Sequence, residues 1–141
     1  MARVIEGVLG DVLGPVVKER GLRRVLLVTD SGVRAAGHCE SAVASLERSG
    51  VEVVVFDGVS SNPSELDVAL CSQIARTADV DGFVALGGGS VIDASKAVAA
   101  SVGSGRSVYD LFYGKKNTEP LNEALPIVAI PTTSGTGSEV S

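Results

Sequence analysis

The sequence predicts an α/β fold in which a parallel β-sheet is covered by helices on both faces. Short runs of apolar, often β-branched residues recur along the chain, and each is followed by a segment with apolar residues at helical spacing. The runs are apolar throughout, which is typical of parallel strands buried on both sides. With 141 residues, 45% of them hydrophobic, the chain is long enough for one core, so we expect residues 1–141 to form a single domain.

Four apolar segments are expected to form the strands of this sheet. They are 23–30 (RRVLLVTD), 51–58 (VEVVVFDG), 81–89 (DGFVALGGG) and 125–131 (LPIVAIP). In parallel sheets, ligands bind beyond the carboxyl ends of the strands. A ligand-binding site is therefore expected among the residues that follow the strands.

Helices are predicted before and between the strands, over residues 4–21, 32–50, 62–80 and 90–102. The first of these segments contains glycines and Pro15, which disfavour a continuous helix. For the third, Asn62 and Ser64 are both candidate N-caps, and Pro63 suits the entry turn. Residues 103–124 are polar and irregular and are predicted to form a long connection.

The composition excludes several classes of partner. The chain has 12 basic and 17 acidic residues, a net charge of -5, which argues against binding to nucleic acid or to an anionic membrane surface. Aromatic residues make up only 4%, so platforms for base stacking are not expected. No apolar run approaches the roughly 20 residues of a membrane span, and no signal peptide is visible, so we expect a cytoplasmic protein.

The cysteines and the single histidine do not form a metal-binding pattern. Cys39 and Cys71 are far apart, within segments predicted as helical, and are expected to be small buried or half-buried thiols. His38 lies among small and polar residues and is expected to face solvent. We therefore expect no zinc or iron site made by this chain alone.

Three consecutive glycines, Gly87, Gly88 and Gly89, separate the third strand from the following helix. Glycine lets backbone amides approach a ligand closely, and a helix N-terminus attracts a phosphate or pyrophosphate. Ser90 and Asp93 have the spacing of a capping box, which would fix the start of the helix. The alternative is that the glycines only make a tight turn.

A second loop of small residues follows the fourth strand. The segment 131–139 (PTTSGTGSE) supplies hydroxyl groups, among them Thr132, Thr133 and Thr136, and should emerge at the same edge as the glycines. Two such loops side by side suit a dinucleotide better than a single phosphate. The alternative is a flexible tail.

An acidic residue ends each of the first two strands. A carboxylate in this position can accept hydrogen bonds from a ribose and would repel the additional phosphate of NADP. Asp30 and Asp57 both meet this description, and residue chemistry does not separate them. For Asp30 the alternative role is that of a helix cap.

Four segments together resemble a known family. The stretches LLVTD, FDGVSSNPS, ALGGGSVIDASKAVA and PTTSGTGSEVS, in this order, are similar to the N-terminal dinucleotide-binding half of the iron-containing (group III) alcohol dehydrogenases. The resemblance implies a Rossmann-like domain that is a fragment of a two-domain enzyme, with NAD as cofactor and NADP possible. It implies cofactor contacts from Asp30, Asn62, Gly88, Gly89, Ser90, Asp93, Thr132, Thr133 and Thr136.

Each of these residues takes a role from the resemblance. Asp30 would govern the choice between NAD and NADP, and Gly88 to Ser90 would wrap the pyrophosphate with Asp93 in the helix behind. Asn62 would lie near the cofactor. The threonines of 132–136 would hold its phosphate and ribose side.

The resemblance also implies a reaction, the interconversion of small alcohols with aldehydes or ketones by hydride transfer to NAD(P). The divalent metal, expected to be iron, would be held by a helical C-terminal domain whose residues are absent here, so this chain alone should be inactive. The full-length protein would be a homo-oligomer. Two alternatives stay open: a non-catalytic nucleotide-binding module, and a relative of glycerol dehydrogenase or dehydroquinate synthase, although the GTGSE ending favours the alcohol dehydrogenases.

Overall fold

The computed structural model describes residues 7–60, 62–107 and 124–132 and confirms the predicted α/β fold. In this part of the chain, one parallel four-stranded sheet has the order β2-β1-β3-β4. Its strands are β1 (Arg24–Val28), β2 (Glu52–Phe56), β3 (Gly82–Gly87) and β4 (Ile127–Pro131). Each lies within a segment that the sequence predicted, because apolar β-branched runs are a strong strand signal.

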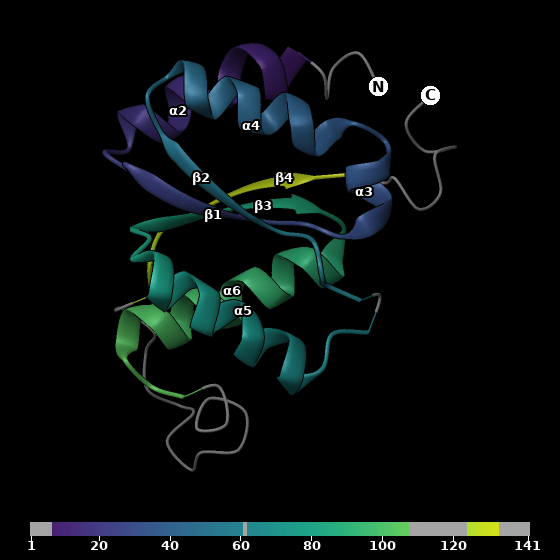
Figure 1. Ribbon diagram of the computed structural model, residues 1–141, viewed down its shortest axis with the longest axis vertical. Coiled ribbons are helices and arrows are strands. Elements are labelled where there is room, and N and C mark those ends of the chain that lie inside the picture. The colour runs from purple at the N-terminus through teal and green to yellow at the C-terminus, as the bar shows by residue number, and fades with distance from the viewer. Residues whose placement is uncertain (1–6, 61, 108–123, 133–141) are drawn as a thin grey trace.

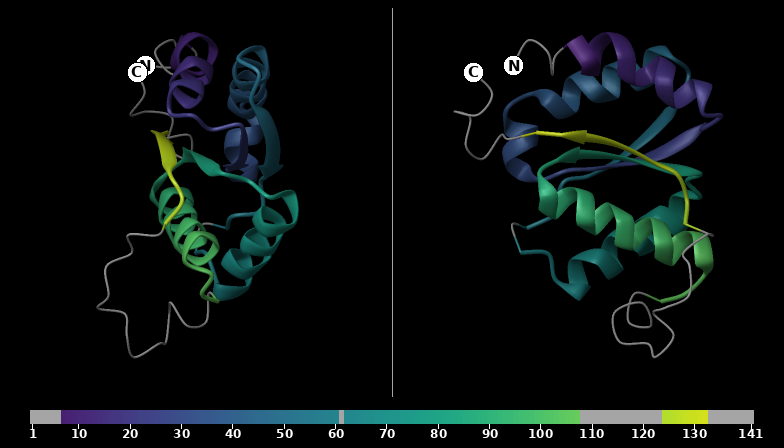
Figure 2. Two further views of the ribbon diagram at one scale, coloured as in Figure 1. Left: turned by 90° about the vertical axis from the view of Figure 1, so that its left-hand side faces the viewer. Right: turned by 180° about the vertical axis from the view of Figure 1, so that it is seen from behind.

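Helices cover both faces of the sheet, as Figure 1 shows. One face carries the π-helix η1 (Val8–Val12), α2 (Leu13–Glu19) and α4 (His38–Arg48). The other carries α5 (Glu65–Ala78) and α6 (Gly89–Ser104). The edge-on view in Figure 2 shows the two helical layers on opposite sides of the strands. The short helix α3 (Ser31–Ala35) follows β1 directly.

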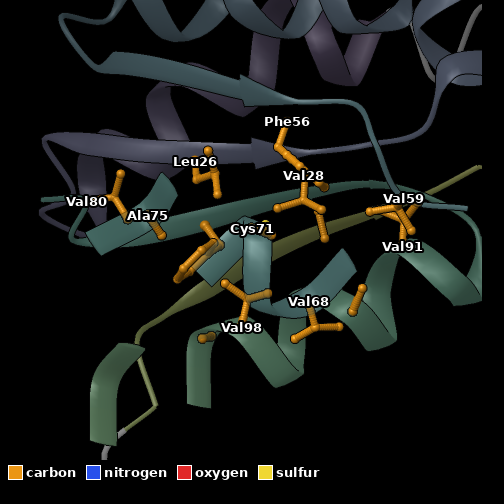
Figure 3. Close-up of a cluster of buried hydrophobic side chains, with 14 residues drawn as sticks. Leu26, Val28, Phe56, Val59, Val68, Cys71, Ala75, Val80, Val91 and Val98 are labelled. Carbon is orange, nitrogen blue, oxygen red and sulfur yellow. The ribbon is translucent and has the colours of Figure 1, made fainter. Parts of the chain in front are cut away.

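Alternating side chains of the central strands divide the core into two clusters. Leu26 and Val28 of β1 point to the side of α5 and α6, where they join the cluster drawn in Figure 3. Val25 and Leu27 point to the side of α2 and α4. All four are fully buried, which explains why the strand reads as continuously apolar.

Two predicted helices are each divided in the structure. The segment 32–50 forms α3 and α4, separated at Gly37, which has a left-handed backbone (φ 88°) that glycine adopts without strain. In the first segment, η1 precedes α2. Pro15 lies in the first turn of α2 and has no backbone N–H. It therefore cannot donate the hydrogen bond to the Asp11 carbonyl oxygen that a continuous α-helix would contain.

The cap of α5 is settled by the structure. Ser64 is the N-cap and forms a capping box with Asp67: the Ser64 hydroxyl accepts from Asp67 N at 3.2 Å, and Asp67 Oδ2 accepts from Ser64 N at 3.3 Å. Asn62 lies before the helix and is not its cap. In the described ranges, no helix combines the length and apolar character needed to cross a membrane.

Candidate functional site

The strand order reverses between β1 and β3. After β1 the chain builds β2 on one side, and it then returns to place β3 and β4 on the other. In doubly wound sheets this reversal opens a crevice beyond the carboxyl ends of the two strands. Asp30 follows β1 there, and Gly88 follows β3.

Hydrogen bonds hold the strand ends together at this edge. The buried Thr29 hydroxyl donates to the Leu86 carbonyl oxygen at 2.7 Å, which connects the end of β1 to β3. Thr132 N donates to the Gly87 carbonyl oxygen at 2.9 Å, which connects β3 to the residue after β4. The glycine turn therefore starts from a fixed position.

The three glycines of the turn have different surroundings. A Cβ on Gly87 would lie 2.7 Å from Val91 Cγ2, so the fold itself requires glycine there. Among the described residues, a Cβ on Gly88 would meet only Thr132 O, at 3.8 Å, which is ordinary contact, and a Cβ on Gly89 would have none of them within 4 Å. The packing of the described residues does not explain why Gly88 and Gly89 are glycines.

The turn leads directly into the N-terminus of α6. The helix begins at Gly89 after the N-cap Gly88, and no side chain caps it. The predicted capping box of Ser90 and Asp93 is therefore wrong: both residues already lie inside the helix, where Ser90 cannot have the extended backbone of an N-cap. The positively polarised N-terminus of this 16-residue helix, without a side-chain cap, therefore lies at the carboxyl edge of the sheet, directly after β3.

Thr132 lies beside this turn, and its side-chain hydroxyl is buried. The residue is 7% exposed, and its Oγ1 has no hydrogen-bond partner among the residues that the structure describes. A buried hydroxyl without a partner costs free energy. Thr132 thus supplies a polar group that a ligand can satisfy. Thr133 and Thr136 lie outside the described residues.

Three other predicted residues meet in a pocket of about 310 Å³ between the start of α5 and the first turns of α6. Its lining consists of Asn62, Pro63, Val68, Ser90, Asp93, Ala94 and Ala97. Amide, hydroxyl and carboxylate groups from two segments thus converge next to the helix N-terminus. Asp30 and Thr132 do not line this pocket.

Asp30 caps α3, as the alternative interpretation proposed. Its Oδ1 accepts a hydrogen bond from Val33 N at 2.8 Å, and the side chain is half-buried. Asp57, the competing acid, is paired with Arg34: Arg34 Nη1 lies 2.8 Å from Asp57 Oδ2. No sequence pattern singled out Arg34 or Thr29, although each lies within four residues of Asp30.

Among the described residues, the thiols and carboxylates do not form a second reactive site. Cys39 and Cys71 are free and buried, as predicted, and burial raises the pKa of both thiols, that of Cys71 to about 12. Neither is a thiolate at neutral pH. Within 7–60, 62–107 and 124–132, no group of three or more His, Cys, Asp or Glu is placed to hold a metal ion. The described residues therefore do not fit a metal.

A larger cavity, about 590 Å³, lies at the opposite edge of the sheet and is lined by Arg23, Arg24, Gly50, Glu52, Asp79, Val80 and Asp81. Three of its charged side chains, Arg24, Glu52 and Asp81, have partners within the chain. Asp81 accepts from the backbone amides of Arg23 and Arg24, and Arg24 Nε is paired with Glu52 at 2.6 Å. These contacts connect the amino ends of β1 and β2 to the start of β3, and we assign them a structural role.

Comparison with known proteins bears out the resemblance seen in the sequence. The model of the family described as iron-containing alcohol dehydrogenase matches residues 4–141. The 4-hydroxybutyrate dehydrogenase of Cupriavidus necator is 44% identical over 123 residues, which cover 86% of this chain and 31% of that protein. The choline dehydrogenase of Bacillus subtilis (strain 168) is 40% identical over 130 residues, 91% of this chain and 32% of that protein.

Solved structures show the same similarity. The NADH-dependent butanol dehydrogenase A of Thermotoga maritima superposes with a TM-score of 0.79 at 32% identity, over 89% of this chain and 31% of that one. The sulfoacetaldehyde reductase of Bifidobacterium kashiwanohense, solved in complex with NAD+, gives 0.78 at 32% identity, over 96% and 35%. The chain thus spans about a third of the length of these relatives. It belongs to the iron-containing alcohol dehydrogenase family.

Proposed function

We propose that the carboxyl edge of this sheet binds NAD, with the pyrophosphate against Gly88, Gly89 and the N-terminus of α6. The observation that carries the proposal is the space that the described residues leave over Gly88 and Gly89, where a Cβ would fit and none is present. A bare backbone at a helix N-terminus is what a diphosphate needs for close approach. One structural relative is described as NADH-dependent, and another was solved with NAD+.

The remaining predicted residues supply polar groups for other parts of the dinucleotide. The Asp30 carboxylate has one oxygen in the cap of α3, and its Oδ2 accepts none of the hydrogen bonds described, so it is available to a ribose hydroxyl. Thr132 offers its buried hydroxyl to the phosphate side. Asn62, Ser90 and Asp93 supply polar groups in the adjoining pocket. The family resemblance implies that Thr133 and Thr136 would also contact the cofactor.

The bound cofactor would accept a hydride from a small alcohol. This chain would contribute cofactor binding and orientation, whereas the metal and the substrate pocket would come from residues elsewhere in a longer protein. The relatives are named for 4-hydroxybutyrate, choline and 1,3-propanediol, which favours short alcohols or their carbonyl products as substrates. The two free cysteines are compatible with a cytoplasmic location, and we propose a homo-oligomer for the longer protein.

Calorimetric titration with NAD tests the binding proposal through Gly88→Val. The extended backbone of Gly88 accommodates valine, and the one described atom near its Cβ position is at van der Waals distance, so the variant should fold. A branched side chain would block the pyrophosphate, and we expect affinity for NAD to fall at least about tenfold, about 1.4 kcal/mol.

Gly10→Val is the matched control for this titration. Gly10 lies in η1, remote from the turn, and a Cβ there would have no described atom within 4 Å. It should leave NAD affinity unchanged. Unchanged affinity in a folded Gly88→Val variant would reject the pyrophosphate site.

A turnover assay tests the proposal that this chain binds the cofactor but does not itself supply the metal site. The 141-residue chain is incubated with NAD, iron(II) or zinc, and a panel of short alcohols and diols, while the absorbance of reduced cofactor is followed. We expect no metal-dependent turnover, because the described residues do not supply a metal site. Turnover well above a blank without protein would show that this chain carries the chemistry.

A further inference from the structure

We propose that Asp57 and Arg34 form a second determinant of cofactor choice, in which Asp57 keeps the Arg34 guanidinium from binding the 2′-phosphate of NADP. This inference rests on the proposed binding of NAD at the carboxyl edge. The proposed effect is separate from that of Asp30. It depends on the Arg34 guanidinium, which lies near the proposed ribose position and is paired with Asp57.

The backbone brings the three charged residues to one place. Strands β1 and β2 pair in register with Val28 opposite Phe56, so Asp57 and Asp30 leave the sheet at the same edge. Arg34 lies one helical turn beyond Asp30, and its backbone N–H donates to the Asp30 carbonyl oxygen at 3.1 Å. From α3 its side chain reaches Asp57, with Nη1 2.8 Å from Oδ2.

The ion pair is accessible to a ligand. The side chains of Arg34 and Asp57 are 51% and 44% exposed. The hydrogen bond to Asp57 raises the pKa of the Arg34 guanidinium above its usual value, so the group is charged at any working pH. Exposed pairs of this kind contribute little to stability, so a different partner can replace Asp57 with little effect on the fold.

The pairing of Arg34 with Asp57 would affect the binding of NADP through its 2′-phosphate. Guanidinium is the side-chain group best suited to bind a phosphate, because its N–H donors match two phosphate oxygens. Asp57 occupies one of these donor positions and neutralises the charge. NADP would have to displace Asp57 and approach two carboxylates, whereas NAD meets no such obstacle. Both acids therefore favour NAD, Asp30 by repulsion and Asp57 by holding the cation.

The test measures the dissociation constants of NAD and NADP for the wild type, Asp57→Asn, and the double variant Asp57→Asn/Arg34→Gln. Asp57→Asn keeps the shape of the side chain and removes its charge. We expect NAD affinity to stay within about twofold, and NADP to bind about fivefold or more tightly, as expected for one released charged hydrogen bond. The double variant should lose this gain.

The results separate the inference from the function on which it rests. If the wild type binds neither dinucleotide, the proposed function fails and the inference fails with it. If NAD binds normally and Asp57→Asn leaves NADP affinity unchanged, the inference alone is overturned. A gain that persists in the double variant also overturns it, because Asp57 would then act by its own repulsion. Thermal unfolding of each variant confirms that the fold is retained.

Discussion

At the scale of single residues, three adjacent glycines perform different tasks. Gly87 is required by the fold, because its Cβ would lie against the Val91 side chain. Gly88 and Gly89 have space for a Cβ among the described residues. Packing therefore does not require glycine at these two positions, and we attribute both glycines to the binding of a ligand. The sequence places the three together but does not distinguish them, because the distinction depends on where the first turn of α6 brings Val91.

Alanine substitutions separate these tasks. Gly87→Ala should destabilise the protein by about 1–3 kcal/mol, the range for overpacking a buried position. Gly89→Ala should leave stability unchanged or raise it by up to about 1 kcal/mol, because alanine favours the helix. Urea unfolding of the two variants gives both values. Equal destabilisation by the two substitutions would show that Gly89 is also required by the fold.

Asp30 combines a structural role with a proposed functional one. Asp30→Gly removes the carboxylate, and glycine is itself tolerated as an N-cap, so the loss of stability should be only a few tenths of a kcal/mol. Without the negative charge, the preference for NAD over NADP should narrow by about tenfold or more, or invert. The ratio of the two dissociation constants measures this. An unchanged ratio would leave Asp30 as a helix cap only.

At the scale of elements, the strands were predictable and the helix boundaries were less so. Buried parallel strands appear in the sequence as unbroken apolar runs, and each observed strand lies within its predicted segment. Helix boundaries depend on competing local signals. Ser64 with Asp67 and Ser90 with Asp93 have the same spacing, but only the first pair caps a helix. In the second, Gly88 takes the extended backbone instead.

Two substitutions at the start of α5 test this assignment. Ser64→Ala removes a cap that the structure shows and should lower the free energy of unfolding by about 1 kcal/mol. Asn62→Ala should leave it unchanged, because Asn62 lies outside the helix and lines the pocket. Chemical denaturation measures both. A larger loss from Asn62→Ala would contradict the capping assignment.

At the scale of the whole molecule, the sheet order determines which loops meet. The sequence indicates that strands alternate with helices, and it indicates the edge where a ligand should bind, but it does not determine which strands are neighbours. The order β2-β1-β3-β4 brings Asp30 and the glycine turn to one crevice. It also brings Arg34 to Asp57, a contact between residues 23 positions apart that no local pattern indicates.

The central claim is that NAD binds at this edge with its pyrophosphate against the first turn of α6. Two-dimensional 15N–1H NMR of the 141-residue chain during a titration with NAD tests it most directly, because each backbone amide reports on its own surroundings. We predict that the largest shift changes occur at Gly88, Gly89 and Ser90, with smaller changes near Asp30. Changes centred on the cavity of Arg23, Asp79 and Asp81 at the opposite edge, or no changes at saturating NAD, would contradict it.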